Sequence, residues 1–159
     1  MKELLIQAAQ RSGVVDAQLL RDFFDQHADD QRRIDQILLT APTFTEDMVL
    51  RLFAEALGIP FLDEINPSDV PREFIEQIPA PYVQHHYLIG IRPQGGNGLI
   101  RVIAANPLNM TAVDNISKML RCPVEMGLST RAAITAAIDV AYEQKNTVIE
   151  EVAEELDAQ

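Results

Sequence analysis

The side chains that most often bind metals or act as nucleophiles are few in this sequence, and their spacing favours neither role. Three histidines are present, and His85 and His86 are the pair that lies close together. Adjacent side chains point about 100° apart on a helix and to opposite faces of a strand, so two such rings seldom bind one metal ion. The single cysteine, Cys122, lies in an apolar stretch that we expect to be strand, where a buried thiol is more common than a reactive one. We therefore predict no metal site.

Motifs for nucleotide hydrolysis and covalent catalysis are also missing from the sequence. No segment matches the phosphate-binding pattern G-x-x-x-x-G-K-[ST] or the nucleophile pattern G-x-S-x-G. The glycine cluster at residues 95–98 lacks the lysine and separates two apolar runs, which is typical of a β-hairpin turn. The carboxylates are scattered or lie in runs such as Asp29-Asp30. These observations predict a binding or regulatory module with no catalytic residues and no cofactor of its own.

The charge balance narrows the choice of partner. The 159 residues carry 13 basic and 24 acidic side chains, a formal net charge of −11. Residues 1–64 hold 6 basic and 12 acidic side chains, residues 65–142 hold equal numbers, and residues 143–159 hold 1 and 6. A duplex nucleic acid and an anionic membrane surface both attract a basic face, so we exclude both as partners. No apolar run reaches the roughly 20 residues that span a bilayer, which predicts a cytoplasmic protein without membrane insertion.

The first 62 residues have the pattern of four amphipathic helices in two hairpins. The residues expected to begin or end these helices are Gly13, Asp16, Pro42, Thr45 and Gly58. A polar loop at residues 27–31 separates the second helix from the third. The core positions expected in the first two helices are Leu4, Leu5, Ala8, Ala9, Leu19, Leu20, Phe23 and Phe24.

The two helical hairpins resemble each other at an offset of 29 residues. The matched positions are Gly13 with Pro42, Val15 with Phe44, Asp16 with Thr45, Leu20 with Val49, and Phe24 with Phe53. Any two amphipathic hairpins share some periodicity, which is the alternative explanation. The shared order of turn, apolar residue and cap favours an internal repeat.

The periodicity changes from helical to strand-like in the second half of the chain. Apolar runs at residues 87–91 and 99–104 predict a hairpin, and residues 123–128 predict a third strand. Pro71 is expected to begin a short helix before the sheet, which Pro79 and Pro81 interrupt, and two more helices are expected after caps at Asn109 and Ser129.

The predicted fold class is therefore α+β. We expect a helical-hairpin module at residues 1–62, a linker at 63–72, and a small α/β module with a three-stranded sheet at 73–143. Residues 144–159 are expected to be an acidic tail or a linker toward a further domain.

Four short motifs occur in order along the chain. They are Ala56-Leu57-Gly58-Ile59-Pro60-Phe61-Leu62-Asp63, Ile78-Pro79, Ile103-Ala104-Ala105-Asn106-Pro107-Leu108-Asn109, and the helix at residues 134–142. Their order and spacing resemble the N-terminal region of the ATPases of type II secretion and type IV pilus assembly, the family of general secretion pathway protein E. The resemblance covers about residues 3–143.

This resemblance implies a docking role. In that family the region precedes a motor that binds ATP and Mg²⁺ and is expected to be a hexamer. The N-terminal region holds the ATPase against the cytoplasmic domain of an inner-membrane secretion protein. The resemblance thus implies a non-catalytic domain, peripheral to the inner membrane, that couples such a partner to the motor of a secretion or pilus system.

Some relatives bind cyclic di-GMP through a doubled motif, R-L-G-x-x-L-[VI]-x-x-G, in the helical hairpins. The residues of this chain that match the motif, and are thus the candidate ligand residues, are Gly13, Arg33, Leu38 and Leu39. The first copy lacks the arginine, and Asp35 replaces the glycine two residues after Arg33. Because arginine supplies paired donors to phosphate or guanine and glycine permits close approach, these replacements weaken the motif. A cyclic di-GMP receptor is the alternative to the docking function.

The acidity of residues 1–64 has two interpretations. The carboxylates either meet a basic surface on a protein partner, which would speed association, or form the solvated faces of amphipathic helices. The sequence leaves both open.

Overall fold

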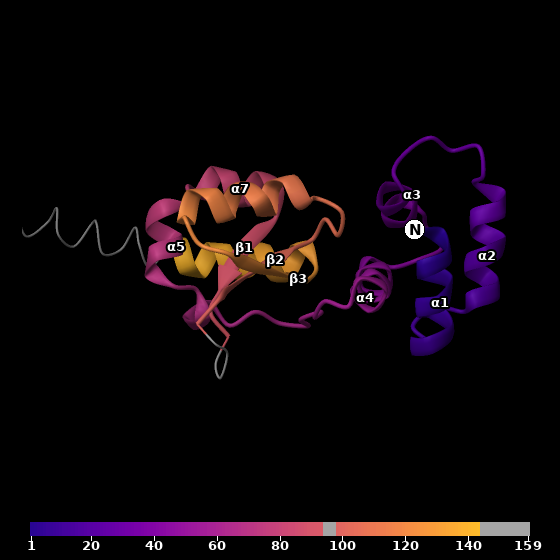
Figure 1. The fold of residues 1–159 in the computed structure, drawn as a ribbon, viewed down its shortest axis with the longest axis horizontal. Helices are drawn as coiled ribbons and strands as arrows, with labels where there is room; N and C mark the ends of the chain where they lie inside the picture. The colour runs from indigo at the N-terminus through magenta and orange to yellow at the C-terminus, as the bar shows by residue number, and fades with distance from the viewer. Residues whose placement is uncertain (94–97, 144–159) are drawn as a thin grey trace, which may run out of the picture.

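The computed structural model describes residues 1–93 and 98–143, which form two lobes joined by an extended segment (Figure 1). The first lobe contains helices α1 to α4, and the second contains a three-stranded sheet with further helices packed around it. This is the predicted order of a helical module followed by a small α/β module. The predicted tail at 144–159 and most of the predicted turn at 95–98 lie outside the described residues.

Two pairs of caps define the helical module. Its helices are α1 Lys2–Ser12, α2 Ala17–Gln26, α3 Ile34–Thr40 and α4 Glu46–Leu57. Gly13 and Gly58 end α1 and α4 with φ values of 71° and 68°, a left-handed conformation that glycine adopts without steric cost. The side chains of Asp16 and Thr45 accept hydrogen bonds from backbone N–H groups in the first turns of α2 and α4, at 2.9 and 3.1 Å. These four predicted caps are confirmed.

The internal repeat is present in the packing of the helical module. Equivalent positions are buried in both copies: Val15 with Phe44, Leu20 with Val49, and Phe24 with Phe53. Helix α1 packs against both α2 and α4, and α3 packs against α4. The turn of the second copy also contacts α2, because the Phe44 ring lies edge-on to Phe23 at 5.1 Å between centroids. The two hairpins therefore share one core.

Leu4 and Leu19 are exposed, contrary to the prediction that they face the core. Their side chains are 48% and 46% exposed, and Ile6 is buried in α1 instead. Because α1 lies between α2 and α4, its buried stripe extends to Ile6 rather than to Leu4. Within the described part of the chain, α2 packs extensively against one helix, α1, so the side that carries Leu19 faces solvent.

The α/β module is built on a sheet with the strand order β1–β2–β3. The strands are β1 Leu88–Ile91, β2 Ile100–Ala104 and β3 Val124–Leu128. Strand β1 pairs antiparallel with β2, as the predicted hairpin requires, and β2 pairs parallel with β3. Helix α7 Met110–Leu120 connects β2 to β3 and covers one face of the sheet (Figure 1). Residues 131–143 are also helical, with the predicted inward positions Ile134, Ala137, Ile138 and Ala141 buried.

Two short helices precede the sheet, where one interrupted helix was predicted. Helix α5 Arg72–Gln77 follows Pro71, and α6 Ala80–His86 follows Pro79. Pro81 lies inside α6 but does not break it, because a missing N–H is tolerated in the first turn of a helix. Tyr87, predicted to begin the first strand, instead ends α6 with φ of 51°.

The segment that leaves α4 pairs with the outer edge of β3. The Leu62 N–H donates to the Leu128 carbonyl at 2.9 Å, and the Leu128 N–H donates to the Pro60 carbonyl at 2.9 Å. Phe61 forms the parallel bridge between these two bonds. We call residues 59–63 the exit segment. It makes the helical module contiguous with the sheet.

Ser129 has a different role from the predicted helix cap. Its hydroxyl is fully buried and donates to the Leu62 carbonyl at 2.7 Å, so it fastens the exit segment. Thr130 caps the following helix instead, accepting a hydrogen bond from the Ala133 N–H at 3.3 Å. The expected linker contains a short 3₁₀ helix, η1 Pro67–Asp69. The predicted boundaries of the modules remain predictions.

Candidate functional site

Arg33, the arginine of the predicted nucleotide motif, is paired with the acid two residues after it. Its Nε lies 3.3 Å from Oδ1 of Asp35, and a terminal nitrogen donates to Oδ2 at 3.4 Å. The Asp35 side chain is fully buried, and its Oδ1 has no properly oriented hydrogen-bond donor among the described residues. The guanidinium therefore compensates a buried charge. The acid that replaces a motif glycine thus engages the motif arginine.

The four candidate ligand residues lie in four different surroundings. Gly13 lies in the turn between α1 and α2, and Arg33 precedes α3. Leu38 is fully buried in the helical core. Leu39 is half-buried and lines a cavity at the boundary between the two modules. Their assignment to a ligand stays a prediction.

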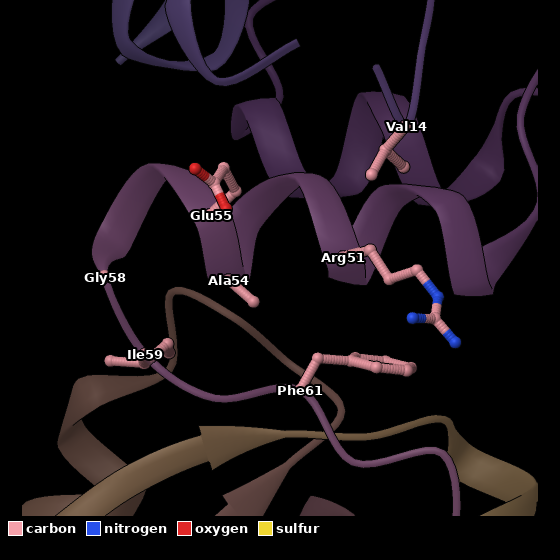
Figure 2. A pocket seen from close by; sticks show the side chains of 7 residues that line it. All are labelled: Val14, Arg51, Ala54, Glu55, Gly58, Ile59 and Phe61. Carbon is pink, nitrogen blue, oxygen red and sulfur yellow. The ribbon is translucent and has the colours of Figure 1, made fainter. Parts of the chain in front are cut away.

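A cavity of about 410 Å³ lies beside the C-terminal half of α4 (Figure 2). Its lining residues are Val14, Arg51, Ala54, Glu55, Gly58, Ile59 and Phe61. Figure 2 shows the Arg51 side chain extending over the Phe61 ring, and the guanidinium carbon lies 4.4 Å from the ring centroid. This separation is that of a cation–π contact.

Two carboxylates hold Arg51 in addition to the ring. Its Nε donates to Asp47, one turn earlier in α4, at 2.7 Å, and a terminal nitrogen pairs with Asp63 of the exit segment. The hydrogen bond to Asp47 raises the pKa of Arg51. These contacts fasten the exit segment to α4 and are structural. Phe61 belongs to the motif at residues 56–63, but no residue near it in the sequence indicated that Arg51 would lie over its ring.

A second cavity, of about 220 Å³, lies between the two modules. Its lining residues are Gln36, Leu39, Thr40, Glu46, Tyr87, Ala105, Asn106 and Arg131. The Arg131 Nε donates to Glu46 at 2.7 Å, and the Arg131 backbone N–H donates to the same carboxylate at 3.0 Å. The guanidinium also lies 5.9 Å from the centroid of the Tyr87 ring. An ion pair therefore borders this cavity and joins the modules.

The residues considered for metal or thiol chemistry lie apart from both cavities. Within residues 1–93 and 98–143, no three histidine, cysteine, aspartate or glutamate side chains are grouped to hold a metal ion. His85 and His86 lie at the end of α6 with nearly perpendicular rings. Cys122 is a partly buried free thiol in the turn after α7, not in a strand as expected, because β3 begins two residues later. Among the residues that the structure describes, no helix combines the length and the hydropathy that a transmembrane span requires.

Comparison with known proteins identifies the family to which the α/β half of the chain belongs. Residues 57–147, which begin at the end of α4 and include the exit segment, match the family model of the MshEN domain. The chain belongs to the MshEN domain family. The helical hairpins of residues 1–56 precede the part of the chain that the family model matches.

The chain is also similar to a longer protein and to two solved structures. It is 23% identical over 150 residues to the type IV pilus assembly ATPase PilB of Myxococcus xanthus (strain DK1622), covering 94% of this chain and 25% of PilB. The structure of MshE with cdg has a TM-score of 0.60 at 17% identity, covering 87% of this chain and 98% of that one. The N-terminal domain of XpsE has a TM-score of 0.52 at 20% identity, covering 84% and 91%.

These similarities confirm two predictions. The resemblance to the N-terminal region of the secretion and pilus-assembly ATPases holds, and the α+β fold is that of the MshE and XpsE structures. The chain spans about a quarter of the length of PilB, and its fold is that of the N-terminal domain of XpsE.

Proposed function

We propose that this chain is a non-catalytic docking domain of a secretion or pilus-assembly ATPase. It binds the cytoplasmic domain of an inner-membrane component and couples that component to a motor, which supplies ATP and Mg²⁺ binding and forms a hexamer. The observation that carries the proposal is family membership combined with a fold shared over 84% of the chain with the XpsE N-terminal domain. The domain is cytoplasmic and reaches the inner membrane through its protein partner.

The charge distribution supports a protein partner. Residues 1–64 hold twice as many acidic as basic side chains, whereas residues 65–142 are balanced, so a basic partner surface would approach the helical module. Such complementarity accelerates association and sets specificity more than it raises affinity.

Titration of the purified chain with the cytoplasmic domain of the inner-membrane component tests the proposal. We expect saturable binding that weakens when salt rises from about 50 mM to about 500 mM, because added salt screens exposed charges. Binding that does not change with salt would eliminate the electrostatic interpretation. Absence of binding at both salt concentrations would eliminate docking to this component.

A cyclic di-GMP receptor is the second candidate function. The observation in its favour is the fold shared with the structure of MshE with cdg, which covers 87% of this chain. Against it stands the pairing of Arg33 with the buried Asp35 carboxylate, because this interaction occupies one edge of the guanidinium and places a negative charge beside any phosphate bound there.

Calorimetry with cyclic di-GMP distinguishes the two candidates. We expect no heat of binding at about 100 μM protein, a concentration that detects dissociation constants in the micromolar range. If a saturating curve appears, and Arg33→Ala abolishes it while circular dichroism shows that the variant is folded, the receptor function replaces docking as the better account.

A further inference from the structure

The second helices of the two hairpins are equivalent in fold but differ in their neighbours. The 29-residue offset relates α2 to α4. Helix α4 packs against α1 and α3 and also contacts β3. Among the described elements, α1 is the one helix against which α2 packs extensively. One side of α4 is therefore covered by other parts of the chain, whereas the equivalent side of α2 is open.

On α4, the exit segment covers this side. The Arg51 guanidinium lies over the Phe61 ring (Figure 2). It also pairs with Asp63, two residues further along the same segment. Successive side chains of an extended chain alternate in direction, so residues two apart face the same way. The second copy thus binds an extended segment with an aromatic residue followed by an acid.

Each of the two turns lies near the second helix of the opposite hairpin. Val14, in the turn of the first copy, lines the cavity beside α4. Phe44, in the turn of the second copy, packs against Phe23 of α2. A residue from the turn of the opposite hairpin thus lies beside each second helix, although the repeat relates Phe44 to Val15 rather than to Val14.

On α2 the equivalent side is open to solvent, and it carries acidic residues where α4 carries a basic one. Asp22 stands at the position equivalent to Arg51, and Asp25 stands at the position of the buried Ala54. Both aspartates are exposed, and the described hydrogen-bond partner of Asp22 is the neutral amide of Gln18, at 3.0 Å. Leu19 is 46% exposed, although its equivalent, Met48, packs against the core. A leucine flanked by carboxylates thus remains in solvent on α2.

We infer that this side of α2, which we call the outer α2 face (Gln18, Leu19, Asp22, Asp25 and Gln26), is the docking surface. Its occupant is a basic segment of the protein partner. On α4 the basic Arg51 pairs with the acidic Asp63, and on α2 the equivalent position is the acidic Asp22, which would pair with a basic side chain. That segment places an apolar side chain against Leu19 and a lysine or arginine against Asp22 and Asp25. Charge complementarity of this kind governs encounter, while burial of an apolar side chain adds affinity. The inference rests on the proposed docking function.

The charge-reversal variant Asp22→Arg/Asp25→Arg tests the outer α2 face. The matched control is Glu76→Arg/Asp139→Arg, which changes the net charge equally at two exposed positions of the α/β module. Both variants and the wild-type chain are titrated with the purified cytoplasmic domain of the inner-membrane component at low salt, after circular dichroism has shown equal helix content. Leu19→Ala is titrated as well, because truncation of an exposed side chain leaves folding unaffected.

We expect the reversal on α2 to weaken binding at least about tenfold, and Leu19→Ala to weaken it a few-fold, with a change below about twofold for the control. If the wild-type chain binds and the α2 variants bind equally well, the inference is overturned while the docking function stands. The inference is also overturned if both double variants weaken binding equally, since net charge alone would then explain the loss. If the wild-type chain does not bind, the docking function fails and the inference fails with it.

Discussion

Glu46 and Arg131, separated by 85 positions in the sequence, form a hydrogen-bonded ion pair that joins the two modules. Glu46 lies in the first turn of α4, and its carboxylate accepts hydrogen bonds from both the Nε and the backbone N–H of Arg131. That N–H belongs to the first turn of the helix at residues 131–143, where a carboxylate is favoured by the helix dipole. This pair thus adds a side-chain link between the modules to the backbone pairing of the exit segment with β3.

Replacement of Glu46 by alanine should loosen this junction. Because Arg131 is 61% exposed, we expect a loss of only about 0.5–1 kcal/mol of unfolding free energy. The variant should also let the two modules move more independently. NMR relaxation should then show a larger difference between the rotational correlation times of the two modules than in the wild-type chain. Glu55→Ala, which removes an ion pair with Arg11 inside the helical module, is the control. Equal relaxation behaviour of the two variants would contradict a junction role for Glu46.

Gly127→Ala should destabilise the chain where the exit segment meets β3. An added Cβ would lie 2.8 Å from the Ile103 Cδ1 atom and 3.3 Å from the Pro60 carbonyl oxygen. Such overpacking costs about 1–3 kcal/mol, which chemical denaturation measures directly. The comparison variant is Gly13→Ala, where nothing lies within 4 Å of the new Cβ but φ is 71°. Hydrogen exchange of the Leu62 N–H should accelerate in the first variant and not in the second.

Arg33→Ala should destabilise the chain although Arg33 is half exposed. Removing the guanidinium leaves the buried Asp35 carboxylate without its charge partner, at a cost of about 1–2 kcal/mol, less than for a fully buried pair because solvent screens the half-exposed guanidinium. Adding Asp35→Leu should recover most of the loss, because the orphaned charge is then gone. A double-mutant cycle measured by denaturation gives the coupling between the two positions. A coupling energy near zero would show that the pair does not stabilise the fold.

Asp30 should make stability depend on pH at the acidic end. The side-chain hydrogen bond from Arg32 lowers the Asp30 pKa from 3.8 to about 2. A folded-state pKa below the unfolded one stabilises the chain above pH 4, and this stabilisation is lost as pH falls toward 2. The stability difference between the wild-type chain and Asp30→Asn should therefore shrink between pH 4 and pH 2. A difference that stays constant over this range would refute the assignment, and Arg32→Ala should raise the Asp30 pKa measured by NMR.

Features set by neighbouring residues were predictable from the sequence. The caps Gly13, Asp16, Thr45 and Gly58 act within one turn of chain, so residue type alone identified them. The 29-residue repeat was visible for the same reason, since each copy repeats a local order of turn, cap and apolar residues.

Features set by distant residues were not predictable. The burial of Ile6 rather than Leu4 depends on where α4 packs, and the role of Ser129 depends on a carbonyl 67 positions away. Proline signals were ambiguous, because Pro79 can end one helix or begin the next. In the candidate site, the replacement of a motif glycine by Asp35 was visible, but its pairing with Arg33 required the folded chain.

We propose that the chain docks a protein rather than a cyclic dinucleotide. The most direct test is isothermal titration of one preparation of the 159-residue chain with the cytoplasmic domain of the inner-membrane component and, separately, with cyclic di-GMP. We predict saturable, salt-sensitive binding of the protein and no heat of binding with the dinucleotide. Binding of cyclic di-GMP without binding of the protein would contradict the account.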